Sequence, residues 1–106
     1  MKILIVEDSE EMLFVLKEII NPALDVTFAT DFNEAKAFLE VHTPDLVITD
    51  WNFPYGNGDD VARLARAKGC KRIILHSGSV KYEANLYDDT IEKLNTHKIL
   101  QVLKFS

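Results

Sequence analysis

The chain has 106 residues, of which 47% are hydrophobic and 27% charged, and its formal net charge at pH 7 is −5. These values predict one globular domain over residues 1–106, and the scattered basic residues disfavour nucleic-acid binding. The single cysteine, Cys70, excludes an intrachain disulfide. The apolar run at the N-terminus is too short for a signal peptide or a membrane span, so we expect a cytoplasmic protein without membrane contact.

Short runs of aliphatic and β-branched residues alternate along the chain with segments of helical periodicity. The runs occupy residues 3–6, 26–29, 46–49, 72–76 and, less clearly, 99–103. Three of them are almost continuously apolar, which is typical of strands that are buried on both faces. The pattern therefore predicts an α/β fold with a mainly parallel sheet and helices on each side.

Helices are predicted in the intervals between these strands. The first has apolar residues at helical spacing from residue 12 to residue 20, with Asp8 or Ser9 as its N-cap and Pro22 after its end. The second begins at the capping-box pair Asp31 and Glu34. A third precedes Cys70 and ends at the neighbouring glycine.

Beyond residue 77 the pattern is weaker. Asp89 and Glu92 again have capping-box spacing, which predicts a helix near residues 90–96. The apolar run at 99–103 suits either a short buried strand or a helical turn, and periodicity alone does not decide between them. We take it as the fifth strand.

Polar side chains follow four of the expected strands. They are Glu7 and Asp8, Asp50, Ser77, and Lys104. Because ligands bind at the carboxyl ends of strands in open α/β sheets, we expect these side chains to converge. Three carboxylates held together repel one another unless a cation joins them, and oxygen ligands with open positions suit Mg²⁺. The sequence thus predicts a magnesium site there.

Four segments together carry a family resemblance. They are Ile-Val-Glu-Asp at 5–8, Asp-Leu-Val-Ile-Thr-Asp at 45–50, the loop Asp-Trp-Asn-Phe-Pro-Tyr-Gly-Asn-Gly at 50–58, and Ile-Ile-Leu-His-Ser-Gly at 73–78. In this order and spacing the chain resembles a receiver domain of two-component response regulators, including the single-domain chemotaxis type. The resemblance implies a doubly wound, flavodoxin-like sheet of five parallel strands in the order 2-1-3-4-5.

The resemblance also implies a role for each site residue. Asp50 would accept a phosphoryl group from a sensor histidine kinase or a histidine phosphotransfer protein. Mg²⁺ would be held by Glu7, Asp8, Asp50 and the backbone carbonyl of Asn52; Ser77 and Lys104 would contact phosphoryl oxygens; the Asn52 side chain and Ser79 would tune the attack of water. The added charge would then switch contacts with a downstream protein.

The C-terminal part departs from the family pattern. The interval from Ser77 to Lys104 is longer than usual, Phe105 replaces a proline, and Gln101 replaces the aromatic residue of many members. The chain also ends at Ser106, where the family continues into a final helix. We therefore expect that helix to be missing and one sheet face to be partly uncovered, to be covered by a partner, a second copy of the chain or a missing downstream segment.

Two other functions compete with a phosphoacceptor domain that promotes only its own phosphorylation and dephosphorylation. The departures favour a phosphorylation-independent interaction module that keeps the receiver fold, whereas the retained site residues oppose it. An unrelated α/β enzyme is disfavoured, because the glycines form no P-loop and Asn52 stands where an aspartyl phosphatase has its second aspartate. His76 is expected to neighbour the site, and Trp51 either shields it or anchors a partner.

Overall fold

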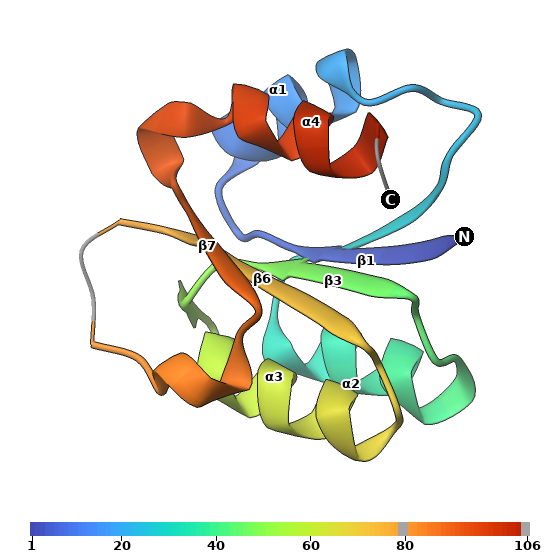
Figure 1. Cartoon of the computed structure of the whole chain (residues 1–106), viewed down its shortest axis with the longest axis vertical. Helices are drawn as coiled ribbons and strands as arrows, with labels where there is room; N and C mark the ends of the chain where they lie inside the picture. Colours follow the sequence, from blue (N-terminus) through green and yellow to red (C-terminus); the bar gives the residue numbers. More distant parts are fainter. Residues whose placement is uncertain (79–80, 105–106) are drawn as a thin grey trace.

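Five parallel strands form a single sheet with two helices on each face (Figure 1). The computed structural model describes residues 1–78 and 81–104. The sheet strands are β1 (Lys2–Val6), β2 (Asp25–Ala29), β3 (Leu46–Thr49), β6 (Arg72–Ser77) and β7 (Asp89–Glu92), and the helices are α1 (Glu10–Ile19), α2 (Phe32–Val41), α3 (Gly58–Ala67) and α4 (His97–Lys104). The short strands β4 (Asn52–Phe53) and β5 (Gly56–Asn57) form a separate hairpin, and η1 (Ala84–Leu86) and η2 (Lys93–Asn95) are 3₁₀ turns.

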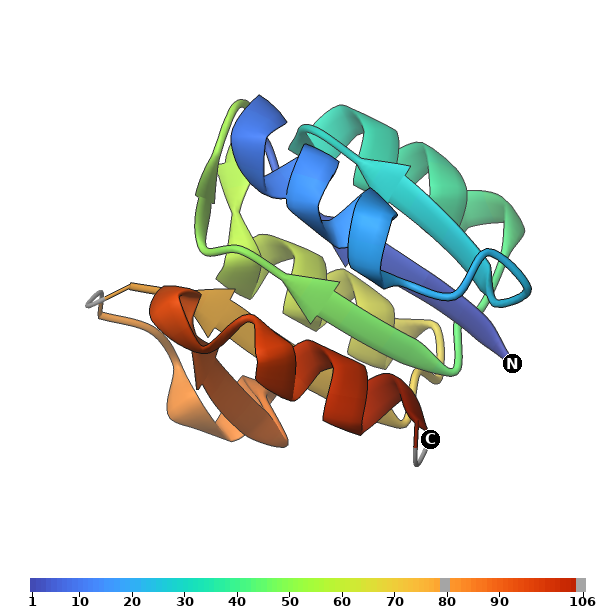
Figure 2. The ribbon, with the colours of Figure 1, turned by 90° about the horizontal axis from the view of Figure 1, so that it is seen from above.

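The order of the sheet is β2-β1-β3-β6-β7, which confirms the predicted doubly wound, flavodoxin-like topology. In β3 every residue is buried, as are all but the first residues of β1 and β6, because helices cover both faces of these central strands. Figure 2 shows α1 and α4 on one face and α2 and α3 on the other. Within the described residues no helix has the length and hydropathy needed to cross a bilayer.

The first three helices begin and end near the predicted positions. Ser9 is the N-cap of α1, and its side chain accepts a hydrogen bond from the Met12 amide at 3.3 Å. Asp31 likewise caps α2 by accepting from the Glu34 amide at 2.8 Å. At α3 the capping box is complete, since Asn57 and Asp60 each accept a hydrogen bond from the other's backbone amide.

Two predicted elements of the C-terminal third are wrong. The fifth strand is β7, which pairs in parallel with β6, so the helix predicted near 90–96 is wrong apart from the single turn η2. The run 99–103 is not a strand but lies within α4. Its burial has helical spacing, because Ile99 and Leu103 are buried while Gln101, which would share their face in a strand, is exposed.

The final helix is therefore present, although it has only eight residues. Ile99 and Leu103 pack in one hydrophobic cluster with Leu16 of α1 and with Ile91 of β7. This packing covers the sheet face that the sequence predicted to be bare. The expected site for a second copy on an uncovered sheet face is consequently absent from the described part of the chain.

The packing of α4 can be tested by truncating one side chain. Ile99 is fully buried, so Ile99→Ala should lower the free energy of unfolding by about 2–4 kcal/mol through lost burial and a residual cavity. Leu100, which is 37% exposed, provides the control, and Leu100→Ala should cost less than about 1 kcal/mol. Urea denaturation measures both values. Equal losses at the two positions would contradict the helical packing.

Candidate functional site

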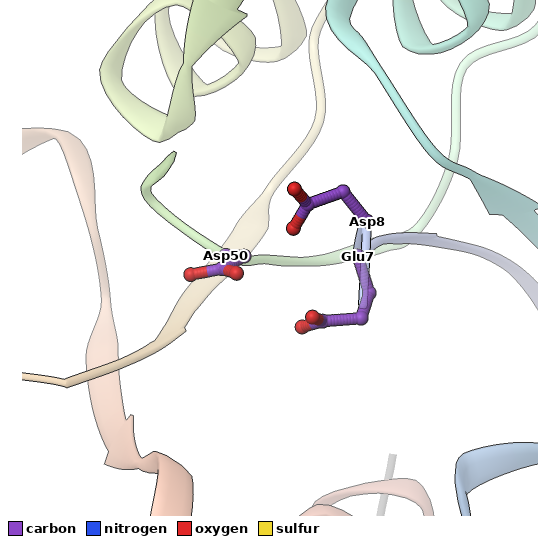
Figure 3. Close-up of side chains that lie close together, drawn as sticks. All are labelled: Glu7, Asp8 and Asp50. Atoms are coloured by element: carbon purple, nitrogen blue, oxygen red, sulfur yellow. The ribbon is translucent and has the colours of Figure 1, made fainter. Parts of the chain in front are cut away.

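Three carboxylates meet at the carboxyl ends of β1 and β3. Glu7 and Asp8 directly follow β1 and Asp50 directly follows β3, and each offers an oxygen within 4.8 Å of the others. Figure 3 shows Glu7 and Asp8 extending from the end of β1 toward the side of Asp50. Glu7 and Asp50 are buried, with exposed fractions of 1% and 8%, whereas Asp8 faces solvent. The predicted carboxylate cluster is thus present, with one member accessible from outside.

Backbone hydrogen bonds fix the two ends of this cluster. The Asp50 amide donates to the carbonyl of Val6 at 2.8 Å, which continues the β1–β3 pairing up to the site. The Asp50 side chain is oriented locally, because its Oδ1 accepts from the Trp51 amide at 2.7 Å. Glu7 Oε1 accepts from the Ser9 amide at 3.2 Å. Backbone amides therefore orient the carboxylates of both Asp50 and Glu7.

The lysine of the site is Lys93, which immediately follows β7. Its Nζ donates to Glu7 Oε2 and lies 3.1 Å from Asp50 Oδ2. Lys104 was predicted to be the lysine of the site because residues 99–103 were predicted to form the fifth strand. Lys104 instead ends α4, which runs from the carboxyl edge of the sheet back toward its amino edge in Figures 1 and 2. The prediction that Lys104 follows the last strand is wrong.

Burial and Lys93 act in opposite directions on Glu7. Removal from water raises the pKa of the Glu7 carboxyl, and the nearby Asp50 charge raises it further. The hydrogen bond and positive charge of Lys93 lower the pKa, as does the Ser9 amide, but the net shift is upward. Glu7 is thus a buried carboxylate whose charge is only partly compensated, as expected for a group that gains from a further cation.

Ser77, Asn52 and Ser79 differ in what the structure shows of them. Ser77 is the last residue of β6, is buried, and is paired in register with Glu92, the residue before Lys93. It therefore lies at the same edge of the sheet as the carboxylates. Asn52 is exposed and begins β4, two residues after Asp50. Ser79 lies outside the described residues.

His76 is a buried neighbour of the site, as expected. It is 2% exposed, and its Nε2 has no hydrogen-bond partner among the described residues. Burial lowers the pKa of His76 from 6.5 to about 4, and the charge of Lys93 contributes in the same direction, against the opposing effect of Asp50. The ring is consequently neutral at pH 7.

The arrangement matches one family over nearly the whole chain. The family model of the response regulator receiver domain matches residues 3–100, and the chain therefore belongs to the response regulator receiver domains. No curated protein gives a match. The comparison with solved structures confirms the expected receiver fold.

Three similar structures illustrate the breadth of this match. The response regulator domain of Thermotoga maritima CheB is 28% identical, with 98% of this chain and 91% of that chain covered and a TM-score of 0.73. The N-terminal domain of an uncharacterized protein from Wolinella succinogenes is 27% identical, with 98% and 91% covered and a TM-score of 0.82. The response regulator TrrA from Thermotoga maritima, solved in complex with Mg(2+)-BeF, is 26% identical, with 98% and 97% covered and a TM-score of 0.79.

The buried imidazole predicts a pH dependence of stability. As pH falls below 6.5 the unfolded chain protonates His76 first, while the folded chain does so only near pH 4, so the folded state loses stability across this window. His76→Leu should reduce the decrease in the free energy of unfolding between pH 7 and pH 5 by roughly 2 kcal/mol. Urea denaturation at both pH values measures it. His97→Gln, at an exposed position, is the control, and an unchanged slope in His76→Leu would contradict the assignment.

Proposed function

We propose that this receiver domain accepts a phosphoryl group on Asp50 from the phosphohistidine of a sensor histidine kinase or a histidine phosphotransfer protein. One observation carries the proposal: Asp50 lies within 4.8 Å of Glu7 and Asp8 and within 3.1 Å of Lys93, at the edge of the sheet where ligands bind in open α/β folds. The cluster joins a nucleophilic carboxylate, a set of metal-ligating oxygens and a cation in one place.

The donor atoms fit Mg²⁺. Glu7, Asp8, Asp50 and the backbone carbonyl of Asn52 would hold the ion, because hard cations select oxygen ligands and Mg²⁺ keeps open positions for water and phosphate oxygens. The raised pKa of Glu7 is consistent with a carboxylate that lacks sufficient positive charge around it. When bound, Mg²⁺ supplies positive charge that neutralises phosphoryl oxygens as the group transfers. The Mg(2+)-BeF complex of the similar regulator TrrA supports this choice of ion.

The residues of the chain itself perform the transfer. A carboxylate oxygen of Asp50 attacks phosphorus, the bond from phosphorus to the histidine nitrogen breaks, and its electron pair leaves with that nitrogen, giving an aspartyl phosphate and a free histidine. The Trp51 amide orients the attacking carboxylate, and Lys93 supplies a countercharge to the incoming oxygens. Ser77, at the end of the adjacent strand, would donate its hydroxyl to one of them.

The proposed output is a change of protein contacts rather than turnover of a substrate. The new phosphoryl oxygens would attract Ser77, at the end of β6, and Lys93, directly after β7. A downstream protein would then bind differently to the shifted surface. The side chain of Asn52, next to the acceptor, and Ser79 would tune hydrolysis of the acyl phosphate. We place this cycle in the cytoplasm, and the chain catalyses no reaction beyond it.

A phosphorylation-independent interaction module is the second candidate. It is favoured by the segment between β6 and β7, which holds only the single 3₁₀ turn η1 between residues 81 and 88, and by Lys93, which already pairs with both buried carboxylates. In such a module Asp50→Ala would leave partner binding unchanged. In a phosphoacceptor domain the same substitution removes the phosphorylation-dependent change in binding.

Phosphorylation can be tested directly by intact mass. Incubation with Mg²⁺ and a small-molecule phosphoryl donor should add one phosphoryl group, and both Asp50→Ala and removal of Mg²⁺ should abolish the addition, because each removes part of the site. Asp25→Ala, which changes an exposed aspartate at the opposite end of a strand, should label normally. An unlabelled wild type, under conditions in which another receiver domain labels, would contradict the proposal.

The role of Lys93 can be separated from that of Lys104 by thermal unfolding with and without Mg²⁺. Lys93→Met should lower the melting temperature of the metal-free protein, because it leaves Glu7 and Asp50 without their nearest cation. Mg²⁺ should restore more stability to this variant than to the wild type, since the ion replaces the missing charge. Lys104→Met should respond to Mg²⁺ as the wild type does. The reverse result would assign the site lysine to Lys104.

A further inference from the structure

We propose that Tyr87 and Asp59 are positioning residues for Asp50, which hold the backbone of the acceptor loop from the connection between β6 and β7. The inference deepens the proposed function and rests on it. Asp59 lies in the first turn of α3, and Tyr87 lies in the connection, two residues before the start of β7. Neither residue was singled out from the sequence, and neither belongs to the carboxylate cluster.

The two side chains form a buried hydrogen bond. Tyr87 Oη donates to Asp59 Oδ1 at 2.8 Å, with 8% of Tyr87 and 7% of Asp59 exposed. The other carboxylate oxygen, Oδ2, accepts from the Glu83 amide at 3.1 Å. Both oxygens of this buried carboxylate are therefore engaged by the connection. Burial and the Asp59 charge raise the pKa of Tyr87, so the phenol remains a hydrogen-bond donor.

The Tyr87 hydroxyl also packs against the glycine that closes the acceptor loop. The Gly58 amide donates to the Trp51 carbonyl at 2.7 Å, directly after Asp50. A Cβ atom on Gly58 would lie 2.7 Å from the Asp50 carbonyl oxygen, 2.9 Å from Tyr87 Oη and 3.0 Å from Trp51 Cα. Because Gly58 has no side chain, the Tyr87 hydroxyl and the backbone of Asp50 and Trp51 can all lie close to it.

This hydrogen bond differs from the other contacts of the connection. Arg63 pairs with Glu83 at 2.6 Å and Arg66 with Asp88 at 2.7 Å, but these pairs are partly exposed to solvent, which weakens each ion pair. They fasten the connection to the outer side of α3, where η1 lies beside the helix in Figure 1. The Tyr87 hydroxyl, by contrast, is one of the three atoms nearest to the position that a Cβ on Gly58 would take. A charge-assisted, buried bond there is both stronger and more directional.

The consequence for the reaction is geometric. The Asp50 carboxylate is oriented by the Trp51 amide, and the position of that residue depends on the Gly58 hydrogen bond to its carbonyl. If Tyr87 loses its hydroxyl, the contact that confines Gly58 from the other side is lost. Small displacements of a nucleophile reduce the rate of transfer strongly, because attack requires a narrow range of distances and angles.

The test is Tyr87→Phe, which removes one oxygen and keeps the ring in the core. Tyr82→Phe is the matched control, since Tyr82 lies on the same connection, stacks edge-on against Tyr87 and is 39% exposed. We expect Tyr87→Phe to slow phosphoryl uptake from a small-molecule donor about tenfold, and to speed hydrogen exchange of the Gly58 amide by a similar factor beyond the change in global unfolding. Tyr82→Phe should change neither.

A second variant guards against loss of folding in the first. Asp59→Asn keeps an oxygen that accepts from Tyr87 but removes the charge, so its uptake rate should lie between those of the wild type and Tyr87→Phe. Urea denaturation of each variant gives the global stability against which the exchange of Gly58 is compared.

The outcomes distinguish the two claims. A wild type that takes up no phosphoryl group overturns the proposed function and the positioning role with it. The other outcome is that Tyr87→Phe and Asp59→Asn are both phosphorylated as fast as the wild type, and that exchange of the Gly58 amide follows only the change in global stability. In that case the Tyr87–Asp59 hydrogen bond is structural, and the positioning role alone is overturned.

Discussion

The rest of the structure depends on a balance of charge at one edge of the sheet. Parallel strands bring Glu7, Asp8 and Asp50 together, and burial of the first raises its pKa because water no longer stabilises the anion. Lys93 offsets part of this cost by contacting two of the carboxylates. Since Lys93 directly follows β7, the site requires β7 to dock as the fifth strand. The chemistry at the end of β3 therefore constrains how the C-terminal third folds.

That constraint is met by polar anchors on a short connection. Asp88 joins the end of the connection to β6, because its carboxylate accepts from the Ile73 amide at 2.8 Å and its own amide donates to the Ile73 carbonyl at 2.8 Å. Burial tends to raise the pKa of Asp88, but the hydrogen bonds from Ile73 and Arg66 outweigh it and the pKa is lowered. Residues 81–88 thus set the register of β7 with directional bonds, where a longer helix would use apolar packing.

Sequence patterns predicted the elements whose burial is continuous or periodic. The apolar runs of β1, β3 and β6 and the cap Asp31 could be predicted directly, as could the carboxylates that follow two of those strands, whereas Ser9 was one of two candidate caps for α1. The last strand, β7, could not be predicted, because only Ile91 in it is buried and its charged neighbours resemble the start of a helix. Because the last strand was predicted at 99–103, Lys104 was predicted to be the lysine of the site. The available signal for this strand was the spacing of Ile91 and Lys93, because residues two apart lie on the same side of an extended segment.

The register of the last two strands explains why one small group could affect so much of the surface. Ser77 and Glu92 are paired across β6 and β7, so Ser77 and the lysine that follows Glu92 lie at the ends of neighbouring strands, and the lysine is 3.1 Å from Asp50. The connection between these two strands begins after Ser77 and ends at Asp88, and within it Tyr87 is hydrogen-bonded to α3 through Asp59. A charge placed on Asp50 would therefore attract both ends of a segment whose middle is fastened elsewhere. In the proposed function, a binding partner would distinguish the two states by the positions of Ser77 and Lys93 relative to Tyr87.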